Sequence, residues 1–252
     1  MPDSMPQITV GLPVFNDPEG LRRSVPTVFA QTWGGPLRLL VVDDGSTDET
    51  PAVLDELAER YAGGIEVVRH ARNRGRPRAR NTILEHAGEG YLAWLDADDL
   101  WHPRKLEAQM ATLLTEEARS DDPLLCTSPI RWSWPEMGQE KIKRPNITGD
   151  QLHRALTGSL YPYLWALLGR VDVFTQAGGF DERLPRRQDY EFLVRFLARG
   201  GRVVRTPEPT PFATYIKSDV GRSGREVATA NRVIARTHRD VYLRYGRRFA
   251  RE

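Results

Sequence analysis

The chain has 252 residues, 40% of them hydrophobic and 28% charged, and its formal net charge is +2. This composition is typical of a folded globular protein, and so small a charge excludes nucleic acid as the expected partner. There is no apolar run of about 18 residues, so no membrane-spanning helix is expected. The lone cysteine, Cys126, excludes an internal disulfide framework. Because no basic segment followed by an apolar one opens the chain, we expect a cytoplasmic location.

Strand and helix patterns alternate through the first hundred residues. Apolar runs predict strands at 8–12, 37–42, 65–69 and 91–95, and amphipathic segments between them predict helices from Asp17, at 49–61 and at 76–87. Nearly continuous apolar strands are typical of a parallel sheet that is buried on both faces. The pattern therefore predicts an α/β fold with a doubly wound, mostly parallel sheet and helices on both faces.

The rhythm weakens after about residue 120, where Pro and Trp are frequent. Helical patterns at 103–114, 170–176, 188–199 and 225–245, and a short strand pattern at 203–204, are the elements that we expect there. The segment between them, 121–165, has no clear period and predicts no element.

Three carboxylates, Asp96, Asp98 and Asp99, follow the apolar run 91–95. Carboxylates near a core are costly unless a cation compensates them. Oxygen ligands of this kind suit magnesium or manganese. The alternative is that Asp99 caps the helix that begins near Pro103, but a cap requires one aspartate and not three.

Polar segments follow all four predicted strands. They are Pro13-Val14-Phe15-Asn16-Asp17, Asp43-Asp44-Gly45-Ser46-Thr47-Asp48, Asn73-Arg74-Gly75-Arg76-Pro77-Arg78-Ala79-Arg80-Asn81 and Leu95-Asp96-Ala97-Asp98-Asp99. The carboxyl ends of parallel strands meet at one edge of the sheet, which is where such folds bind ligands. The four segments therefore predict one cleft lined by carboxylates, arginines and turn backbone.

This set of motifs resembles the family 2 glycosyltransferases, inverting enzymes of the GT-A fold. Two later segments extend the resemblance, Gly178-Gly179-Phe180-Asp181-Glu182 and Gln188-Asp189. It spans roughly residues 7 to 216, with the six motifs in the family's order. The fold that it implies is GT-A, a Rossmann-like nucleotide-binding sheet with an acceptor-side half.

At the nucleoside end of the donor, the resemblance implies that Pro13, Phe15 and Asn16 shape the base pocket. It also implies that Asp44 hydrogen-bonds the pyrimidine or the ribose. The alternative, that Asp43 and Asp44 only form the turn, stays open.

At the phosphate end, the resemblance implies that Arg76 or Arg80 approaches the nucleotide and that Asp96 contacts the ribose. Asp98 would ligate Mn or Mg bridging the diphosphate. This assignment agrees with the chemistry, because a leaving nucleoside diphosphate develops negative charge that a metal stabilises.

Asp189 is implied as the catalytic base, which takes a proton from the attacking acceptor hydroxyl. The alternative is a first-turn residue favoured by the helix dipole. Gln188 stands where the family usually has Glu and is expected to affect acceptor hydrogen bonding. Lys217 or Arg222 is a weaker candidate for the diphosphate, and His238 is expected at the surface rather than near the metal.

The acceptor side would include Trp132 and Trp134, which either stack on sugar faces or belong to the core. We expect a nucleotide-sugar half at 1–100, an acceptor-binding and catalytic half at 101–221, and a basic helical tail at 222–252. The tail's arginines are either a solvated face or a contact with anionic membrane lipid at the inner face.

The expected function is an inverting transfer of a sugar from a UDP- or dTDP-sugar to a hydroxyl acceptor, such as a glycan. One alternative is a nucleotidyltransferase of related fold, but Gly11 to Phe15 holds no glycine-rich loop with a Lys or Arg. The other is a non-catalytic nucleotide-sugar-binding protein, which the retention of Asp96, Asp98 and Asp189 disfavours.

Overall fold

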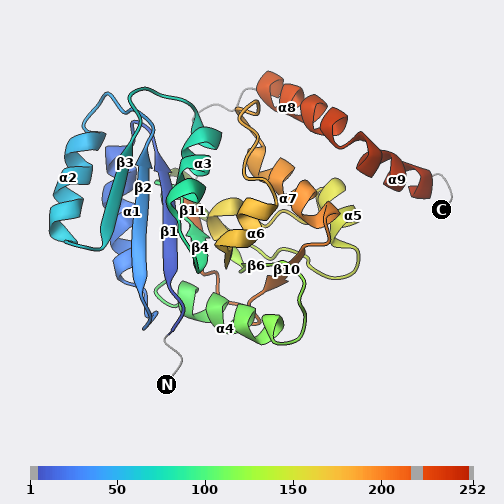
Figure 1. Ribbon diagram of the computed structural model, residues 1–252, viewed down its shortest axis with the longest axis horizontal. Coiled ribbons are helices and arrows are strands. Elements are labelled where there is room, and N and C mark those ends of the chain that lie inside the picture. Colours follow the sequence, from blue (N-terminus) through green and yellow to red (C-terminus); the bar gives the residue numbers. More distant parts are fainter. Residues whose placement is uncertain (1–4, 217–223, 250–252) are drawn as a thin grey trace.

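The computed structural model describes residues 5–216 and 224–249. Among these residues, one large sheet forms the centre of the molecule, in the spatial order β3-β2-β1-β4-β9-β6-β10 (Figure 1). Its strands are β1 (Ile8–Val14), β2 (Leu37–Asp43), β3 (Ile65–Arg69), β4 (Tyr91–Trp94), β6 (Leu124–Thr127), β9 (Leu168–Arg170) and β10 (Arg202–Arg205). Strands β1 to β4 are parallel, and β9 runs antiparallel between β4 and β6. The predicted α/β fold with a mostly parallel sheet is confirmed.

A second sheet, in the order β5-β11-β7-β8, packs beside the first. Its strands are β5 (Asp99–Trp101), β7 (Ile130–Trp134), β8 (Gln139–Lys143) and β11 (Ala213–Ile216). The sequence did not predict this sheet. In particular, Asp99 does not cap the following helix. Instead, Asp99 is the first residue of strand β5, where it pairs with Tyr215 of the antiparallel strand β11.

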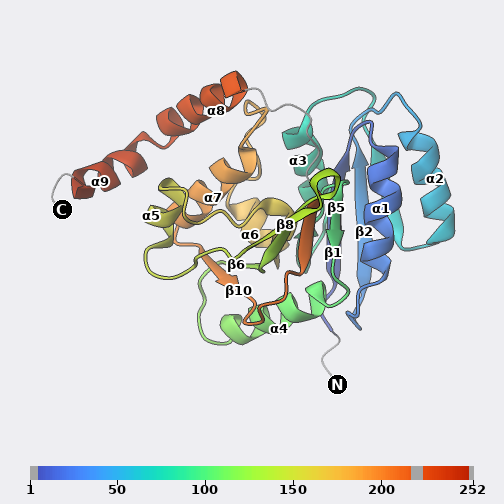
Figure 2. The same ribbon diagram turned by 180° about the vertical axis from the view of Figure 1, so that it is seen from behind.

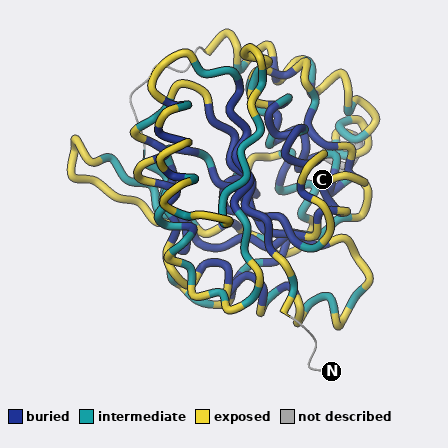
Figure 3. Tube along the Cα trace, turned by 60° about the vertical axis from the view of Figure 1, so that its left-hand side comes forward, coloured by how far each residue is buried: buried dark blue, intermediate teal, exposed yellow. Residues whose placement is uncertain are grey.

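Helices cover both faces of the central sheet, as Figures 1 and 2 show. Helices α1 (Pro18–Phe29), α2 (Thr50–Arg60) and α4 (Lys105–Glu117) share one apolar cluster. Helices α3 (Arg76–His86), α6 (Val171–Gln176) and α7 (Gln188–Ala198) share the other, together with part of α5 (Gln151–Leu156). Single-turn 3-10 helices lie at Pro135–Met137 and Leu164–Ala166. The large sheet is therefore apolar on both sides, and its strands are buried along most of their length (Figure 3).

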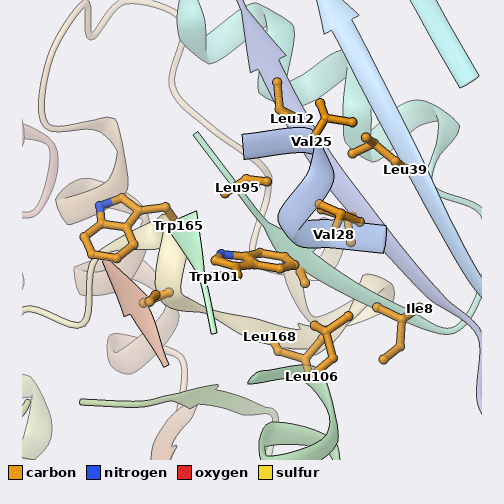
Figure 4. Packing of buried hydrophobic residues seen from close by; sticks show 14 of the residues in the cluster. Ile8, Leu12, Val25, Val28, Leu39, Leu95, Trp101, Leu106, Trp165 and Leu168 are labelled. Carbon is orange, nitrogen blue, oxygen red and sulfur yellow. The ribbon is translucent and has the colours of Figure 1, made fainter. Parts of the chain in front are cut away.

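Close packing explains why the strands read as continuous apolar runs. Leu12 and Leu39 of the sheet contact the apolar cluster that also holds Val25 and Val28 of α1 (Figure 4). On the other face, a Cβ atom added at Gly11 would lie 2.6 Å from Cγ2 of Ile83. A glycine at this position lets α3 approach β1, which brings the start of α3 to the strand ends.

The start of α1 agrees with the expected one, whereas other helix ends differ. Asp17 caps α1 by accepting a hydrogen bond from the Gly20 amide at 2.8 Å, and α1 continues through Pro26. Helix α4 starts at Lys105 and not at Pro103. The expected final helix at 225–245 is two helices, α8 (Gly224–Thr237) and α9 (Arg239–Phe249). Within the described part of the chain, no helix combines the length and the hydropathy needed to cross a bilayer.

Candidate active site

Two adjoining cavities open where the parallel strands end. The first, of about 560 Å³, is lined by predicted donor-site residues, Pro13, Phe15, Asp44, Arg76, Asp96 and Asp98. The second, of about 410 Å³, is lined by Arg76, Arg80, Asp96, Asp98, Trp132, Gln188 and Asp189. The structure thus brings most of the predicted site residues to one continuous region. Two predicted residues, Asn16 and Trp134, line neither cavity.

Asp44 is held by the loop that leads into α3. Its carboxylate accepts hydrogen bonds from the amides of Arg74 at 3.0 Å and Gly75 at 2.8 Å. Nδ1 of His70 lies 2.7 Å from the same carboxylate. The side chain therefore joins the end of β2 to the start of α3, and the contact with His70 is one that the sequence motif did not indicate. Asn16 has a similar bracing contact, because its Oδ1 accepts from the Thr47 amide at 2.9 Å.

Arg76 brings positive charge to both cavities, and Arg80 brings it to the second. Nη2 of Arg80 lies 2.9 Å from Oδ1 of Asp96. Burial raises the pKa of Asp96, but the attraction of Arg80 and Arg76 outweighs it, so the pKa lies below its ordinary value. Asp96 is the main cause of a raised pKa at Arg76, to which Asp98 and Asp189 also contribute. Arg76 therefore lines both cavities and is attracted by carboxylates of each.

The surrounding residues compensate poorly for the ionised forms of Asp98 and Asp99. Burial, followed by repulsion from Asp96, raises the pKa of Asp98 to about 6. Asp99 is fully buried, and burial, then Asp98, raises its pKa well above the ordinary value. Among the described residues, neither carboxylate oxygen of Asp99 has a hydrogen-bond partner. Because a divalent cation would replace the proton that these raised pKa values favour, the acidic cluster fits such an ion.

The structure limits how such a cation could be held. Asp98 lines both cavities, whereas Asp99 lines neither. No group of three or more acidic, His or Cys side chains in residues 5–216 and 224–249 converges on one point. The protein would therefore hold the ion chiefly through Asp98, and oxygen atoms of a phosphorylated ligand and water would complete its shell.

Asp189 lies in the first turn of α7 and lines the second cavity but not the first. Its Oδ2 accepts a hydrogen bond from the Tyr161 hydroxyl at 2.8 Å, and its Oδ1 accepts from the Tyr190 amide at 2.9 Å. Burial, then the Asp189 charge, raises the pKa of Tyr161 well above its ordinary value, so this phenol stays a hydrogen-bond donor. Gln188 beside it is buried and lines the same cavity.

Aromatic rings form the remaining wall of the second cavity. Trp132 lies 5.8 Å from Tyr163 and 5.7 Å from Tyr215 between ring centroids. Tyr163 stacks on Trp165 at 5.7 Å. Trp134 packs on Trp132 instead of facing the cavity. These aromatic residues, Trp132, Tyr163, Trp165 and Tyr215, thus belong both to the core and to the cavity wall.

The C-terminal helices contribute contacts that sequence reasoning missed. His238 is neither at the surface nor near the acidic cluster, because its Nε2 lies 2.8 Å from Oε1 of Glu191 and its side chain is only 10% exposed. Pro185, Arg186 and Glu226 line the first cavity, and Val227 lines the second. Only the tertiary fold reveals these neighbours. Lys217 and Arg222 lie outside the described residues.

A further cavity, of about 610 Å³, lies away from this site, between α4, α5, α7, β10 and α9. Its charged lining is largely paired, since Arg202 lies 3.1 Å from Glu116 and 3.4 Å from Asp122. The polar segments that follow β1, β2, β3 and β4 contribute no residue to its lining. The two adjoining cavities are therefore the candidate active site.

This combination of a mostly parallel sheet, an acidic cluster after β4 and a carboxylate at the start of α7 defines a GT-A glycosyltransferase fold. A family model, "Glycosyl transferase family 2", matches residues 9–161. The chain belongs to this family.

Similar curated proteins are named as glycosyltransferases. An uncharacterized glycosyltransferase of Rickettsia typhi is 27% identical over 200 residues, which cover 76% of this chain and 59% of that protein. The uncharacterized glycosyltransferase YibD of Escherichia coli K12 is 31% identical over 183 residues, 70% of this chain and 52% of the relative. The matched region covers 59%, 58% and 62% of three of the curated relatives, so the chain spans about three fifths of their length.

Solved structures share the fold at low sequence identity. Residues 1–349 of TarS from S. aureus, in complex with UDP-GlcNAc, have a TM-score of 0.69 and 18% identity, covering 91% of this chain and 65% of that one. The mannosyltransferase PcManGT from Pyrobaculum calidifontis, in complex with GDP-Man and Mn²⁺, has a TM-score of 0.59 and 21% identity, covering 88% and 59%.

Proposed function

We propose that the protein is an inverting glycosyltransferase that moves a sugar from a UDP- or dTDP-sugar to a hydroxyl acceptor in one displacement. The observation that supports this most is the second cavity, which Asp98, Asp189 and Arg76 line together, with both carboxylates close enough to raise the pKa of Arg76. One carboxylate lies where a diphosphate would bind and the other where an acceptor would enter. The UDP-GlcNAc complex of a structural neighbour supports the choice of donor.

At the donor, Pro13, Phe15 and Asp44 line the part of the first cavity that we assign to the base and ribose. Asn16 braces the turn at Thr47 and would shape this pocket indirectly. Asp96, oriented by Arg80, would contact the ribose. In this arrangement nucleoside recognition depends on side chains that internal hydrogen bonds already fix in place.

At the diphosphate, Asp98 would hold Mn or Mg, a cation that neutralises charge on the leaving nucleoside diphosphate when it is bound. Arg76 provides a fixed positive charge beside it. Because Arg76 is permanently protonated, it attracts the leaving group at any physiological pH.

At the acceptor, Asp189 would take the proton of the attacking hydroxyl as the new glycosidic bond forms. The Tyr161 hydroxyl occupies one oxygen of this carboxylate and fixes its orientation. Attack from the Asp189 side, opposite the diphosphate, inverts the anomeric carbon. Trp132 and Gln188 line the acceptor path and would contact the acceptor.

The outward side of α8 and the start of α9 carry exposed arginines, among them Arg232, Arg236 and Arg239. Arginines on one helix face attract anionic lipid, so we propose that this face gives the cytoplasmic protein a peripheral contact with the inner membrane surface. The test is flotation of the full chain with liposomes of anionic lipid. The triple variant R232Q/R236Q/R239Q should lose flotation, and equal flotation of both proteins would contradict the contact.

The donor proposal is tested by a thermal-shift panel of UDP, dTDP, GDP and ATP, each with and without Mn²⁺. The expected result is a higher melting temperature with UDP or dTDP, and a larger rise with Mn²⁺ present. A shift that ATP alone produces would refute the assignment. The absence of a shift with every nucleotide in the panel would refute it as well.

A further inference from the structure

The two cavities share five lining residues, Arg76, Asp96, Asp98, Pro185 and Arg186. If the nucleotide occupies the first cavity and the acceptor the second, as proposed above, the transferred sugar must lie at this junction. The groups that surround the junction are therefore the ones that can distinguish one sugar from another.

Most charged side chains around the junction already interact with an opposite charge there. Arg80 pairs with Asp96, and Arg76 is surrounded by the carboxylates of both cavities. Arg186 differs, because its Nε lies 2.5 Å from Oε2 of Glu226, and the two side chains are 41% and 49% exposed. An ion pair as exposed as this contributes little to stability, so it can open or exchange partners at little cost.

Helix α8 is held in a fixed position, which places Glu226 at the cavity. Ala230 and Ile234 are buried in a cluster with Tyr190 and Val194 of α7. One helical turn after Ile234, the His238 ring contacts Glu191, which also belongs to α7. The start of α8 is thus positioned by the same helix that carries Asp189, and Glu226 cannot drift away from the junction without disturbing that packing.

We propose that Arg186 and Glu226 bind hydroxyl groups of the transferred sugar and determine which sugar the protein accepts. A sugar hydroxyl both donates and accepts hydrogen bonds, so it can bond the carboxylate and the guanidinium together. Arg186 lines both cavities and Glu226 lines the first beside it, so the pair presents both functions next to the junction. This inference rests on the proposed function, and it assigns a donor-selective role to a helix that lies outside residues 9–161, the part matched by the family model.

The test compares binding of UDP with binding of UDP-sugars by calorimetry in the presence of Mn²⁺. The UDP-sugars are UDP-glucose, UDP-galactose and UDP-GlcNAc. For each of them, the dissociation constant of UDP is divided by that of the UDP-sugar, in wild type and in Glu226→Gln. This ratio isolates the contribution of the sugar to binding. We expect Glu226→Gln to lower this ratio about tenfold for the preferred sugar, with a smaller effect on its C4 epimer and an unchanged constant for UDP. Arg186→Gln should act in the same way.

The matched control is Asp240→Asn, which makes the same change of charge on the exposed side of α9. It should leave every ratio unchanged. Equal losses for all sugars, a loss of UDP affinity itself, or no change would each overturn the inference. If wild type binds neither uridine nor thymidine diphosphate, the proposed function itself is refuted. If the variants bind UDP as wild type does and their sugar ratios are unaltered, only the inference about Arg186 and Glu226 is refuted.

Discussion

The Tyr161 hydroxyl donates a hydrogen bond to Oδ2 of Asp189 at 2.8 Å, and the phenol ring lies 4.5 Å from Tyr163 between centroids. Tyr161 precedes Asp189 by 28 residues and belongs to a segment with no regular pattern. The contact ties the aromatic wall of the second cavity to the carboxylate that we propose as the base. The other carboxylate oxygen of Asp189, Oδ1, accepts a hydrogen bond from the Tyr190 amide, so both oxygens are oriented before any acceptor binds.

Tyr161→Phe removes this hydrogen bond and keeps the ring. A hydrogen bond to a charged group contributes about 1.5–3 kcal/mol, so we expect kcat to fall about tenfold as the base loses its orientation, while KM for the donor changes little. Tyr91→Phe is the matched control, because it deletes a hydroxyl that donates to Glu117 at 2.6 Å away from the site. An equal loss in both variants would mean that the effect is one of general stability.

Asp189→Asn removes the proton acceptor without changing the shape of the side chain. General-base catalysis typically contributes about 10²- to 10⁴-fold, and we expect kcat to fall by that factor while UDP still binds. Steady-state transfer assays and UDP calorimetry measure the two effects separately. The exposed Asp172 on α6 offers the control Asp172→Asn. Transfer that persists in Asp189→Asn would show that another group takes the proton, and a non-catalytic protein would show no turnover in either form.

Asp98→Asn tests how the cation is held. In wild type we expect Mn²⁺ to raise UDP affinity about tenfold or more, and in the variant we expect Mn²⁺ to make little difference, with metal-free UDP affinity retained. Titrations of UDP with Mn²⁺ and with EDTA provide the readout, and Asp121→Asn in an exposed loop is the control. If Mn²⁺ strengthened UDP binding equally in wild type and Asp98→Asn, the ion would be held elsewhere.

Lys105→Met tests a buried charge in the core. Lys105 is fully buried, its Nζ lies 3.9 Å from the Trp101 ring centroid and donates to Gln109 at 2.7 Å, and burial lowers its pKa from 10.5 to about 7. Between about pH 7 and pH 10 the unfolded chain binds a proton here that the folded chain does not. The free energy of unfolding of wild type therefore rises with pH across this range, by at most about 1.4 kcal/mol per pH unit from this group.

The Met variant should lack this rise, so its stability relative to wild type should be greatest below pH 7 and should diminish as the pH rises. Urea unfolding at several pH values measures the difference. Lys141→Met, on the exposed side of β8, should give a curve parallel to that of wild type. A parallel curve for Lys105→Met as well would contradict the lowered pKa.

Much of the fold of the first hundred residues could be predicted because β1 and β2 are buried on both faces. Ile8, Leu12, Leu40 and Val42 belong to nearly continuous apolar runs, and such runs indicate both the strand and its end. Once the ends were located, the polar residues that follow them had to meet at one edge. For that reason Phe15, Asp44, Asp96 and Asp98 were predicted together.

The remainder depended on contacts that leave no local pattern. Strand β5 is three residues long and begins with an aspartate, so Asp99 resembled a helix cap until its pairing with β11 was known. His238 interrupts the final helical pattern without a glycine or proline, and only its contact with Glu191 explains its burial. Likewise, the pairing of Arg186 with Glu226 joins residues 40 positions apart in sequence.

The most direct test of the central claim is a crystal structure of the protein grown with UDP and Mn²⁺. The account predicts an anomalous manganese peak next to Asp98, the uracil in the cavity lined by Pro13 and Phe15, and the diphosphate pointing toward the cavity that Asp189 lines. Nucleotide density in the separate cavity beneath α9, or a manganese peak remote from Asp98, would contradict it.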